Sequence, residues 1–173
     1  MKTLRVALAG NPNAGKSTIF NALTGSHQHV GNWPGKTVEK KEGKFKNGDY
    51  EIEVIDLPGT YSLTAYSPEE VIARDYILNE KPDLVVTVVD AANLERNLYL
   101  TVQVLELGVP VIVALNMTDM ADTRGLKIDR DMLSRGLQSP VVSTTANKGE
   151  GIDHLVKTML NLAEERIAWQ SMN

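Results

Sequence analysis

The chain reads Gly10-Asn11-Pro12-Asn13-Ala14-Gly15-Lys16-Ser17 between a short apolar run, residues 4–9, and a segment whose apolar residues recur at helical spacing up to Leu23. The apolar run is rich in strand-forming residues, and the glycines and proline that follow it end the strand. The spacing of Ile19, Phe20 and Leu23 predicts that a helix begins near Lys16. A strand joined to a helix by this glycine-rich turn is the unit around which we expect the fold to be built.

The turn matches G-x-x-x-x-G-K-[ST], and its place between a strand and a helix is typical of a P-loop. Its glycines let backbone N–H groups turn inward around phosphate oxygens, and the helix N-terminus favours negative charge. Lys16 would place a positive charge on the β- and γ-phosphates, and Ser17 would offer a hydroxyl to Mg²⁺. We expect the whole loop and the following Thr18 to contact a nucleotide.

Outward from this unit, strand-like and helix-like segments alternate. Strands are expected at 4–9, 38–45, 50–56, 84–90, 111–116 and 141–143, and helices at 16–24, 68–79, 94–107, 129–137 and 152–160, with a further short helix between 116 and 129. The pair Asn47-Gly48 predicts a hairpin, and 26–37 has no clean period and is expected to be a loop. The alternation predicts an α/β fold of the P-loop NTPase type: a Ras-like, six-stranded, mainly parallel sheet with one antiparallel edge strand and helices on both faces.

A second motif, Asp56-Leu57-Pro58-Gly59, ends the 50–56 strand. A carboxylate there can hold Mg²⁺ through water, and the N–H of Gly59 can sense a γ-phosphate. The motif alone is weak, because this pattern is a common turn after a strand. Its position after a P-loop unit strengthens the interpretation.

Two further motifs follow the strands at 111–116 and 141–143. In Asn116-Met117-Thr118-Asp119, a carboxylate can accept two hydrogen bonds from guanine, whereas adenine lacks that donor pair and would leave Asp119 unpaired. Asn116 would tie this loop to the P-loop. Backbone N–H groups of Ser143-Thr144-Thr145 could meet the guanine carbonyl, although this signal is weak by itself.

The composition bounds the function classes. A chain of 173 residues fits one domain, and without cysteine it has no disulfide, no Cys-ligated zinc and no thiol catalysis. Its net charge of −4 disfavours a nucleic-acid partner. No apolar run approaches the roughly 20 residues of a membrane span, so we expect a soluble, cytoplasmic domain.

The four motifs together resemble the translation-factor class of small GTPases. Three further stretches are similar to the N-terminal G domain of the FeoB family of bacterial ferrous iron transporters, and the resemblance covers essentially the whole chain. These stretches are Val30-Gly31-Asn32-Trp33-Pro34-Gly35-Lys36-Thr37-Val38-Glu39, Gly59-Thr60-Tyr61-Ser62-Leu63 and Asn93-Leu94-Glu95-Arg96-Asn97-Leu98-Tyr99-Leu100.

The resemblance implies roles for switch segments around the nucleotide. Thr37 resembles the switch-I threonine that reaches Mg²⁺ and the γ-phosphate, and its neighbours Gly35, Lys36, Val38 and Glu39 are expected to contact the nucleotide with it. Residues 59–67 resemble switch II. Asn13 resembles the asparagine that holds K⁺ in potassium-activated relatives, with the carbonyl groups of Gly31 and Trp33 as further ligands.

The resemblance therefore implies Mg²⁺ held by Ser17, Thr37 and Asp56, and K⁺ held by Asn13, Gly31 and Trp33. Its catalytic set is Asn13, Lys16, Thr37 and Gly59. Two departures stand out. Thr60 occupies the position of the water-positioning glutamine of Ras-like GTPases, so we expect slow hydrolysis. Met117 replaces a lysine that packs against the base in many GTPases.

The leading hypothesis is a GTP-binding, slowly hydrolysing and potassium-activated switch domain, residues 1–173, that regulates Fe²⁺ uptake. Its expected partners are GTP and GDP, a helical regulatory segment and a membrane domain that this chain lacks, with oligomers formed through the full-length protein. The full-length protein would place it at the cytoplasmic face of the inner membrane. Two alternatives stay open: a stand-alone cytosolic GTPase of the Era or tRNA-modification type, and a nucleotide-responsive interaction module. His27 and His29 could bind a transition metal, although a solvated pair is the simpler interpretation.

Overall fold

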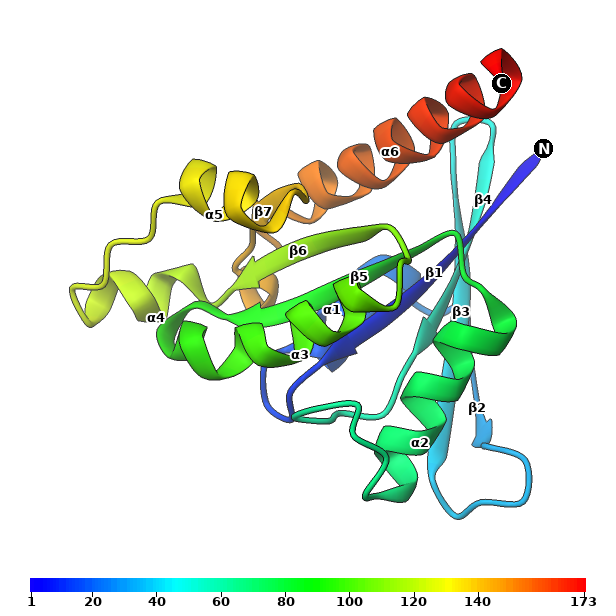
Figure 1. Cartoon of the computed structure of the whole chain (residues 1–173), viewed down its shortest axis with the longest axis horizontal. Coiled ribbons are helices and arrows are strands. Elements are labelled where there is room, and N and C mark those ends of the chain that lie inside the picture. The colour runs from blue at the N-terminus through cyan, green and yellow to red at the C-terminus, as the bar shows by residue number, and fades with distance from the viewer.

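The computed structural model describes all 173 residues and contains one seven-stranded sheet with the order β2-β3-β4-β1-β5-β6-β7 (Figure 1). The strands are β1 (Lys2–Gly10), β2 (Gln28–Asn32), β3 (Glu39–Asn47), β4 (Tyr50–Asp56), β5 (Leu84–Asp90), β6 (Val111–Asn116) and β7 (Val141–Ser143). The helices are α1 (Lys16–Thr24), α2 (Pro68–Asp75), α3 (Leu94–Glu106), α4 (Thr118–Thr123), α5 (Arg130–Leu137) and α6 (Ile152–Met172). The predicted α/β class with a mainly parallel sheet is confirmed.

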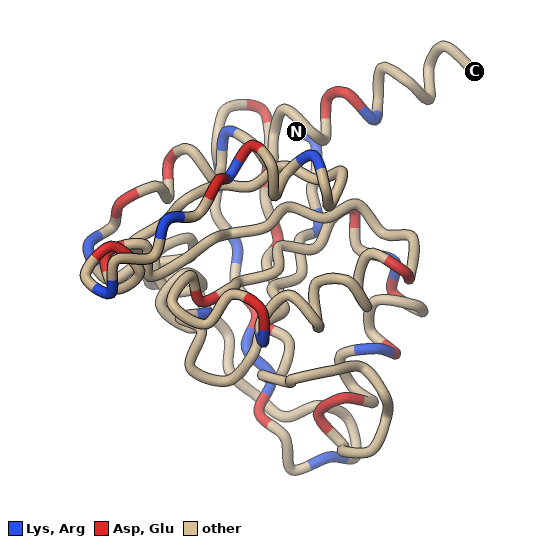
Figure 2. Tube along the Cα trace, turned by 60° about the vertical axis from the view of Figure 1, so that its left-hand side comes forward, with Lys and Arg blue, Asp and Glu red and all other residues tan.

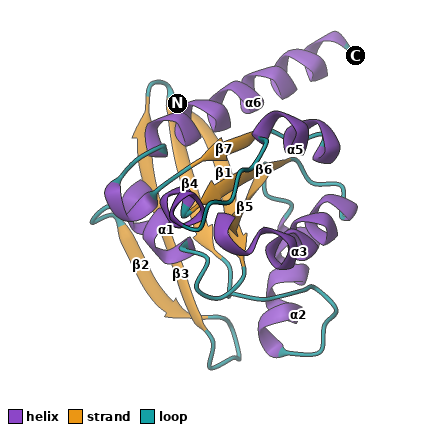
Figure 3. Ribbon diagram, turned by 90° about the vertical axis from the view of Figure 1, so that its left-hand side faces the viewer, coloured by secondary structure: helices purple, strands orange, loops and turns teal.

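Strand β1 shows why the sheet has two cores. Its side chains alternate in direction, so Leu4 and Leu8 enter one apolar cluster with α1 and α6, while Ala7 and Ala9 enter another with α2 and α3. The helices consequently cover both faces of the sheet (Figure 3). Because β1, β4, β5, β6 and β7 run parallel, their carboxyl ends meet at one edge, where ligands of such sheets bind.

The sheet has one strand more than the six expected. Residues 28–32, which we expected to lie in a loop, form β2 and pair antiparallel with β3. The outer edge is therefore β2, and β3 is bonded on both sides. Three lysines of β3 form ion pairs with glutamates: Lys40 with Glu42 at 3.9 Å, Lys41 with Glu39 at 3.8 Å and Lys44 with Glu51 at 3.5 Å. Lys/Arg and Asp/Glu positions are interspersed along the trace (Figure 2).

Helix α2 begins as predicted but ends differently. The hydroxyl of Ser67 accepts a hydrogen bond from the N–H of Glu70 at 3.1 Å, and Pro68 occupies the first helical position. The expected α-helix to Asn79 changes into a π-helical turn, Tyr76–Glu80, where Ile77 stays buried.

The last helix, α6, packs on the sheet through Leu155 and Met159 and then extends past the body of the domain (Figure 1). Its final turns expose Trp169 at 68%. None of the helices is both long enough and apolar enough to span a membrane.

Candidate nucleotide-binding site

The Gly10–Ser17 loop leaves the carboxyl end of β1 and leads into α1, as predicted. Asn13 and Gly15 both adopt positive φ, +67° and +94°, which turns the backbone sharply before the helix begins. A Cβ on Gly10 would lie 2.9 Å from the carbonyl oxygen of Val88, and one on Gly15 would lie 2.1 Å from the Nδ2 atom of Asn116. The loop therefore needs glycine at both positions, because side chains there would collide with neighbouring strands.

Lys16 and Asp56 meet at the centre of the site. The ammonium group of Lys16 donates to Oδ1 of Asp56, and the two side chains are only 10% and 8% exposed. Asp56 ends β4, so the topology brings the two charges together across 40 positions of sequence. Ser17 and Thr18 are exposed in the first turn of α1. A lysine, a carboxylate and a hydroxyl thus surround the N-terminus of one helix.

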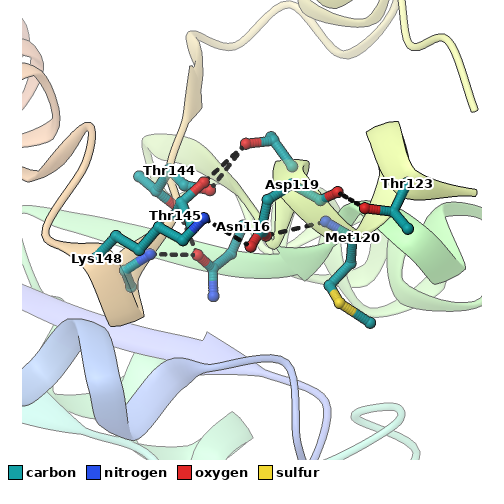
Figure 4. Close-up of polar contacts among 9 residues, drawn as sticks. Asn116, Asp119, Met120, Thr123, Thr144, Thr145 and Lys148 are labelled. Atoms are coloured by element: carbon teal, nitrogen blue, oxygen red, sulfur yellow. Dashed lines mark hydrogen bonds and ion pairs between the residues drawn. The ribbon is translucent and has the colours of Figure 1, made fainter.

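The side chain of Asn116 joins three loops. Figure 4 shows how it lies next to Thr144. The side-chain N–H of Asn116 donates to the carbonyl oxygen of Ala14 in the P-loop at 3.0 Å. Its side-chain oxygen accepts hydrogen bonds from the hydroxyl of Thr144 at 2.9 Å and from the N–H of Ala146 at 3.1 Å. All of these groups are buried. The phosphate loop and the two predicted base-binding loops are therefore one hydrogen-bonded unit.

Thr118 fixes the second predicted base-binding loop, residues 143–145, relative to the first, residues 116–119. Its hydroxyl shares a 3.0 Å hydrogen bond with the hydroxyl of Thr145. Ser143 ends β7. A Cβ on Gly151 would lie only 2.2 Å from the carbonyl oxygen of Ser143, so the two segments are in close contact. Ala146, which the sequence did not single out, supplies the N–H that reaches Asn116. The backbone that faces the base-binding loop thus includes one residue beyond the predicted Ser143–Thr145 stretch.

Asp119 lies in the first turn of the short helix α4, after Met117 in the left-handed conformation with φ +60°. Its Oδ1 atom accepts the N–H of Met120 at 2.9 Å. Its Oδ2 atom lies 3.6 Å from the ammonium of Lys148, a residue that sequence analysis did not identify (Figure 4). No spacing rule links these two residues, since they come from different loops.

Asn11 is 4% exposed, and neither polar atom of its side chain has a hydrogen-bond partner within the protein. Buried polar groups without partners are costly and therefore rare, and a bound ligand is one way to satisfy them. Asn11 lies in the P-loop, where sequence analysis expected a nucleotide contact.

The structure does not bring the switch-I residues to the P-loop. Gly35, Lys36 and Thr37 are exposed in the loop that joins β2 to β3, which extends away from the start of α1 (Figure 1). Val38 is half-buried, and Glu39 begins β3 with an exposed side chain. Gly31 is exposed in β2, opposite Lys40 of β3.

Trp33 anchors this loop. Its ring is 9% exposed and meets Tyr76 edge to face at 5.8 Å, beside a cavity of about 910 Å³ between the β2–β3 ribbon and α2. The backbone N–H of Trp33 donates to the carbonyl oxygen of Val38, and its carbonyl oxygen accepts from the backbone N–H of Lys36, both at 2.9 Å. His27 and His29 also border this cavity, and no three His, Asp or Glu side chains of the chain form a group that could hold a metal ion.

The Leu57–Gly59 turn stays close to the P-loop. A Cβ on Gly59 would lie 3.4 Å from Pro12, in van der Waals contact with it. Thr60 is 5% exposed, and its N–H donates to the carbonyl oxygen of Gly10 at 3.1 Å. Pro58 is half-buried and Leu57 is fully buried. The side chain of Thr60 is thus enclosed by the protein, in contrast to a residue that reaches into solvent to hold water.

Helix α3 holds the segment that follows. The side-chain oxygen of Gln103 accepts the N–H of Leu63 at 2.7 Å, and the guanidinium of Arg96 lies 4.8 Å from the ring centre of Tyr61. The Arg96 contact places part of the Asn93–Leu100 stretch next to the expected switch II.

Residues 4–159 match the family model described as ferrous iron transport protein B. The chain is 54% identical over 164 residues to an Fe(2+) transport protein A/Fe(2+) transporter FeoB fusion protein of Porphyromonas gingivalis, covering 94% of this chain and 19% of that protein. It is 55% identical over 159 residues to the Fe(2+) transporter FeoB of Escherichia coli, covering 90% of this chain and 21% of that protein. The chain thus spans about a fifth of the length of these relatives.

Among solved structures, the FeoB G-domain from Methanococcus jannaschii superposes with a TM-score of 0.85 at 51% identity, covering 95% of this chain and 99% of that one. An S. thermophilus NFeoB mutant bound to GDP has a TM-score of 0.85 at 54% identity, covering 90% of this chain and 61% of that one. The family model and these relatives agree in sequence and fold over nearly all of the chain. The chain belongs to the ferrous iron transport protein B family and corresponds to its N-terminal G domain.

Proposed function

We propose that this chain, residues 1–173, is a guanine-nucleotide switch domain that binds GTP and hydrolyses it slowly to GDP and phosphate. The observation that carries the proposal is the position of Asn116, which bonds the P-loop through Ala14 and the second base-binding loop through Thr144 and Ala146. A single side chain thereby sets the spacing between a phosphate site and a base site. The GDP-bound relative from S. thermophilus supports the same ligand class.

At the phosphate end, the backbone of residues 10–15 and the N-terminus of α1 would bind the phosphate oxygens. Lys16 would leave Asp56 and place its charge on the β- and γ-phosphates. The unpartnered amide of Asn11 lies in the same loop. Thr18 would complete the contacts in the first turn.

The donor set beside Lys16 fits Mg²⁺, which prefers carboxylate and hydroxyl oxygens. Asp56 and Ser17 would hold it, directly or through water, together with Thr37 once switch I closes. The ion supplies charge neutralisation between the phosphates. Asp56 already faces a cation, Lys16, and would exchange this partner for Mg²⁺.

Potassium activation is the finer part of the proposal. Asn13 and the carbonyl groups of Gly31 and Trp33 are neutral oxygen donors suited to a weakly hydrated monovalent ion. Their assembly needs the β2–β3 loop to swing toward the P-loop, and that motion would also bring Thr37 and its neighbours to the nucleotide. The exposure of Thr37 and Gly31 and the glycine at position 35, with φ +68°, are consistent with a loop that moves. The enclosed Thr60 supports a slow rate.

At the base end, the two oxygens of Asp119 would accept the N1–H and the exocyclic amine of guanine. Met117 and Thr118 shape the same loop, and backbone N–H groups of residues 143–146 would face the guanine carbonyl. Adenine offers no matching donor pair, so it would leave a charged group unpaired.

In the full-length transporter we propose that this domain lies at the cytoplasmic face of the inner membrane. Its nucleotide state would regulate Fe²⁺ uptake through a helical segment and a membrane domain. The chain spans only about a fifth of the length of its FeoB relatives, which supports this modular arrangement. Oligomers would form through those other parts. The membrane-transporter relatives favour this role over a stand-alone RNA-acting GTPase.

A competition titration tests the guanine assignment. Unlabelled GDP should displace fluorescent GDP from the wild-type protein and lower the fluorescence signal, whereas ADP should not. Asp119→Asn should weaken GDP binding by about 10- to 150-fold, the effect of losing a charged hydrogen bond of about 1.5–3 kcal/mol, and should shift preference to xanthosine diphosphate. Asp122→Asn, an exposed aspartate of the same helix, is the matched control and should bind GDP normally. Equal competition by ADP and GDP would overturn the proposal.

A further inference from the structure

Lys148 is the only cation that forms an ion pair with Asp119 in this structure. Its ammonium lies 3.6 Å from Oδ2 of Asp119, with the lysine side chain 56% exposed and the aspartate 34% exposed. Figure 4 shows the two side chains pointing toward one another from loops that follow different strands. The contact therefore links the two base-binding loops on their solvent side.

The geometry leaves Asp119 free to bind a base. At 3.6 Å the ammonium is beyond hydrogen-bond distance, so it attracts the carboxylate without occupying a lone pair. Oδ1 accepts one bond, from Met120, and a carboxylate has about four acceptor positions. Lys148 can therefore hold the orientation of Asp119 while both oxygens still accept from a ligand.

The turn that carries Lys148 is itself fixed. Its backbone N–H donates to Thr145 at 3.0 Å, the next N–H, of Gly149, donates to Ala146 at 3.0 Å, and Ala146 in turn donates to Asn116. The backbone that carries the Lys148 side chain is thus anchored to Asn116, the residue that also bonds the P-loop.

Met117 does not supply an equivalent charge. It is an uncharged residue, and its methyl carbon lies 3.6 Å from where a Cβ on Gly15 would be, so its side chain packs toward the P-loop. The positive charge near Asp119 comes instead from the opposite loop.

We propose that Lys148 is a positioning residue for the guanine-reading carboxylate, and that it slows GDP release by holding Asp119 in its base-binding orientation. This inference rests on the proposed guanine-nucleotide function and adds a residue that governs how long the nucleotide stays bound. An exposed ion pair has a modest effect, so the expected change is small but measurable.

Stopped-flow release of mant-GDP tests the inference. Lys148→Ala should release the nucleotide about two- to five-fold faster than wild type, and Lys148→Arg should restore slow release. Lys157→Ala, an exposed lysine of α6 without an ion pair, is the matched control and should match wild type. Raising NaCl should speed release from wild type toward the Lys148→Ala rate, because salt screens exposed charges.

A double-mutant cycle separates positioning from a general structural effect. In an Asp119→Asn background with mant-labelled xanthosine diphosphate, residue 119 is neutral, so Lys148→Ala should leave the release rate unchanged. The inference is overturned if Lys148→Ala releases mant-GDP at the control rate or more slowly, or if its effect persists in the Asp119→Asn background. Wild-type protein that fails to bind mant-GDP at all would overturn the guanine proposal itself, which distinguishes the two failures.

Discussion

The side-chain nitrogen of Asn116 lies 3.0 Å from the carbonyl oxygen of Ala14, although the two residues are 102 positions apart in the chain. The bond is buried and runs from the last residue of β6 to the loop after β1, and these two strands are not neighbours in the sheet. It passes directly over Gly15, whose missing side chain leaves the space that the amide fills. The phosphate and base sites are thereby coupled by packing as well as by hydrogen bonding.

Gly15→Ala should break this coupling. The new methyl group would lie 2.1 Å from Nδ2 of Asn116, and alanine is strained at φ +94°. We expect the free energy of unfolding to fall by about 1–3 kcal/mol and fluorescent-GDP binding to be lost, as measured by urea denaturation and titration. Gly136→Ala in α5, where nothing lies within 4 Å of the added Cβ, is the control and should stabilise the protein slightly. Normal GDP affinity in Gly15→Ala would contradict the account.

Lys16→Met should destabilise the nucleotide-free protein. The sequence predicts that Lys16 places its charge on phosphates; without a nucleotide it is buried against Asp56, so its loss leaves an unpaired buried carboxylate. Breaking such a pair costs about 3 kcal/mol or more, and hydrolysis should also cease. Urea denaturation without nucleotide measures the cost, and adding Asp56→Asn should recover part of it. Ser17→Ala, an exposed neighbour, should lose hydrolysis with unfolding within about 0.5 kcal/mol of wild type. Unchanged unfolding of Lys16→Met would refute the pairing.

Glu70 should make the start of α2 sensitive to acid. The hydroxyl of Thr64 donates to its carboxylate at 2.8 Å, and this bond, with weaker help from the N–H of Tyr66, holds the pKa of Glu70 below its ordinary value of 4.5. Because the folded-state pKa is depressed, the stabilisation is fully present above pH 4.5 and is lost as the pH falls through the folded-state pKa. An NMR titration of the Tyr66 amide should show a midpoint below 4.5. Thr64→Val should move that midpoint upward, and a wild-type midpoint at or above 4.5 would be inconsistent with these contacts.

The sequence predicted the elements whose pattern is local and missed those that depend on distant partners. Strand β1 follows from its apolar run, and helices α1 and α3 and the first turns of α6 follow from apolar periodicity. Helix α6 continues to Met172, beyond the end expected at residue 160. Strand β2 does not follow from such a pattern, because Gln28–Asn32 is mostly polar and mostly exposed and becomes a strand only by pairing with the backbone of β3. The π-helical turn after α2 likewise carries no local signal.

The site shows the same division. The motifs placed Lys16, Asp56, Asn116 and Asp119 at one edge of the sheet, since each follows a parallel strand. The contacts of Ala146 and Lys148 could not be read from spacing, because each depends on how two separate loops pack. The Trp33–Val38 loop lies away from the P-loop, and Trp33 packs there against Tyr76. Spacing could not predict this contact, because Tyr76 lies 43 residues further along the chain.

Potassium should accelerate GTP hydrolysis relative to sodium. A cation beside the phosphates would neutralise charge where an arginine finger elsewhere contributes about 10³–10⁵ in rate, so a change of about ten-fold or more is expected. Asn13→Ala should remove this acceleration and spare GDP binding, which needs the P-loop backbone and the base-binding loops. Asn161→Ala, an exposed asparagine of α6, is the matched control and should keep the potassium response. Equal wild-type rates in the two salts, or a full response in Asn13→Ala, would favour the alternative that Asn13 serves only the turn.

Phosphate release from GTP and from ATP, measured side by side with Mg²⁺ and K⁺, tests the central claim most directly. Lys16→Met protein provides the blank. The account predicts slow but clear release from GTP and release from ATP at the level of the blank. Comparable release from both nucleotides, or none from GTP in protein that binds GDP, would contradict it.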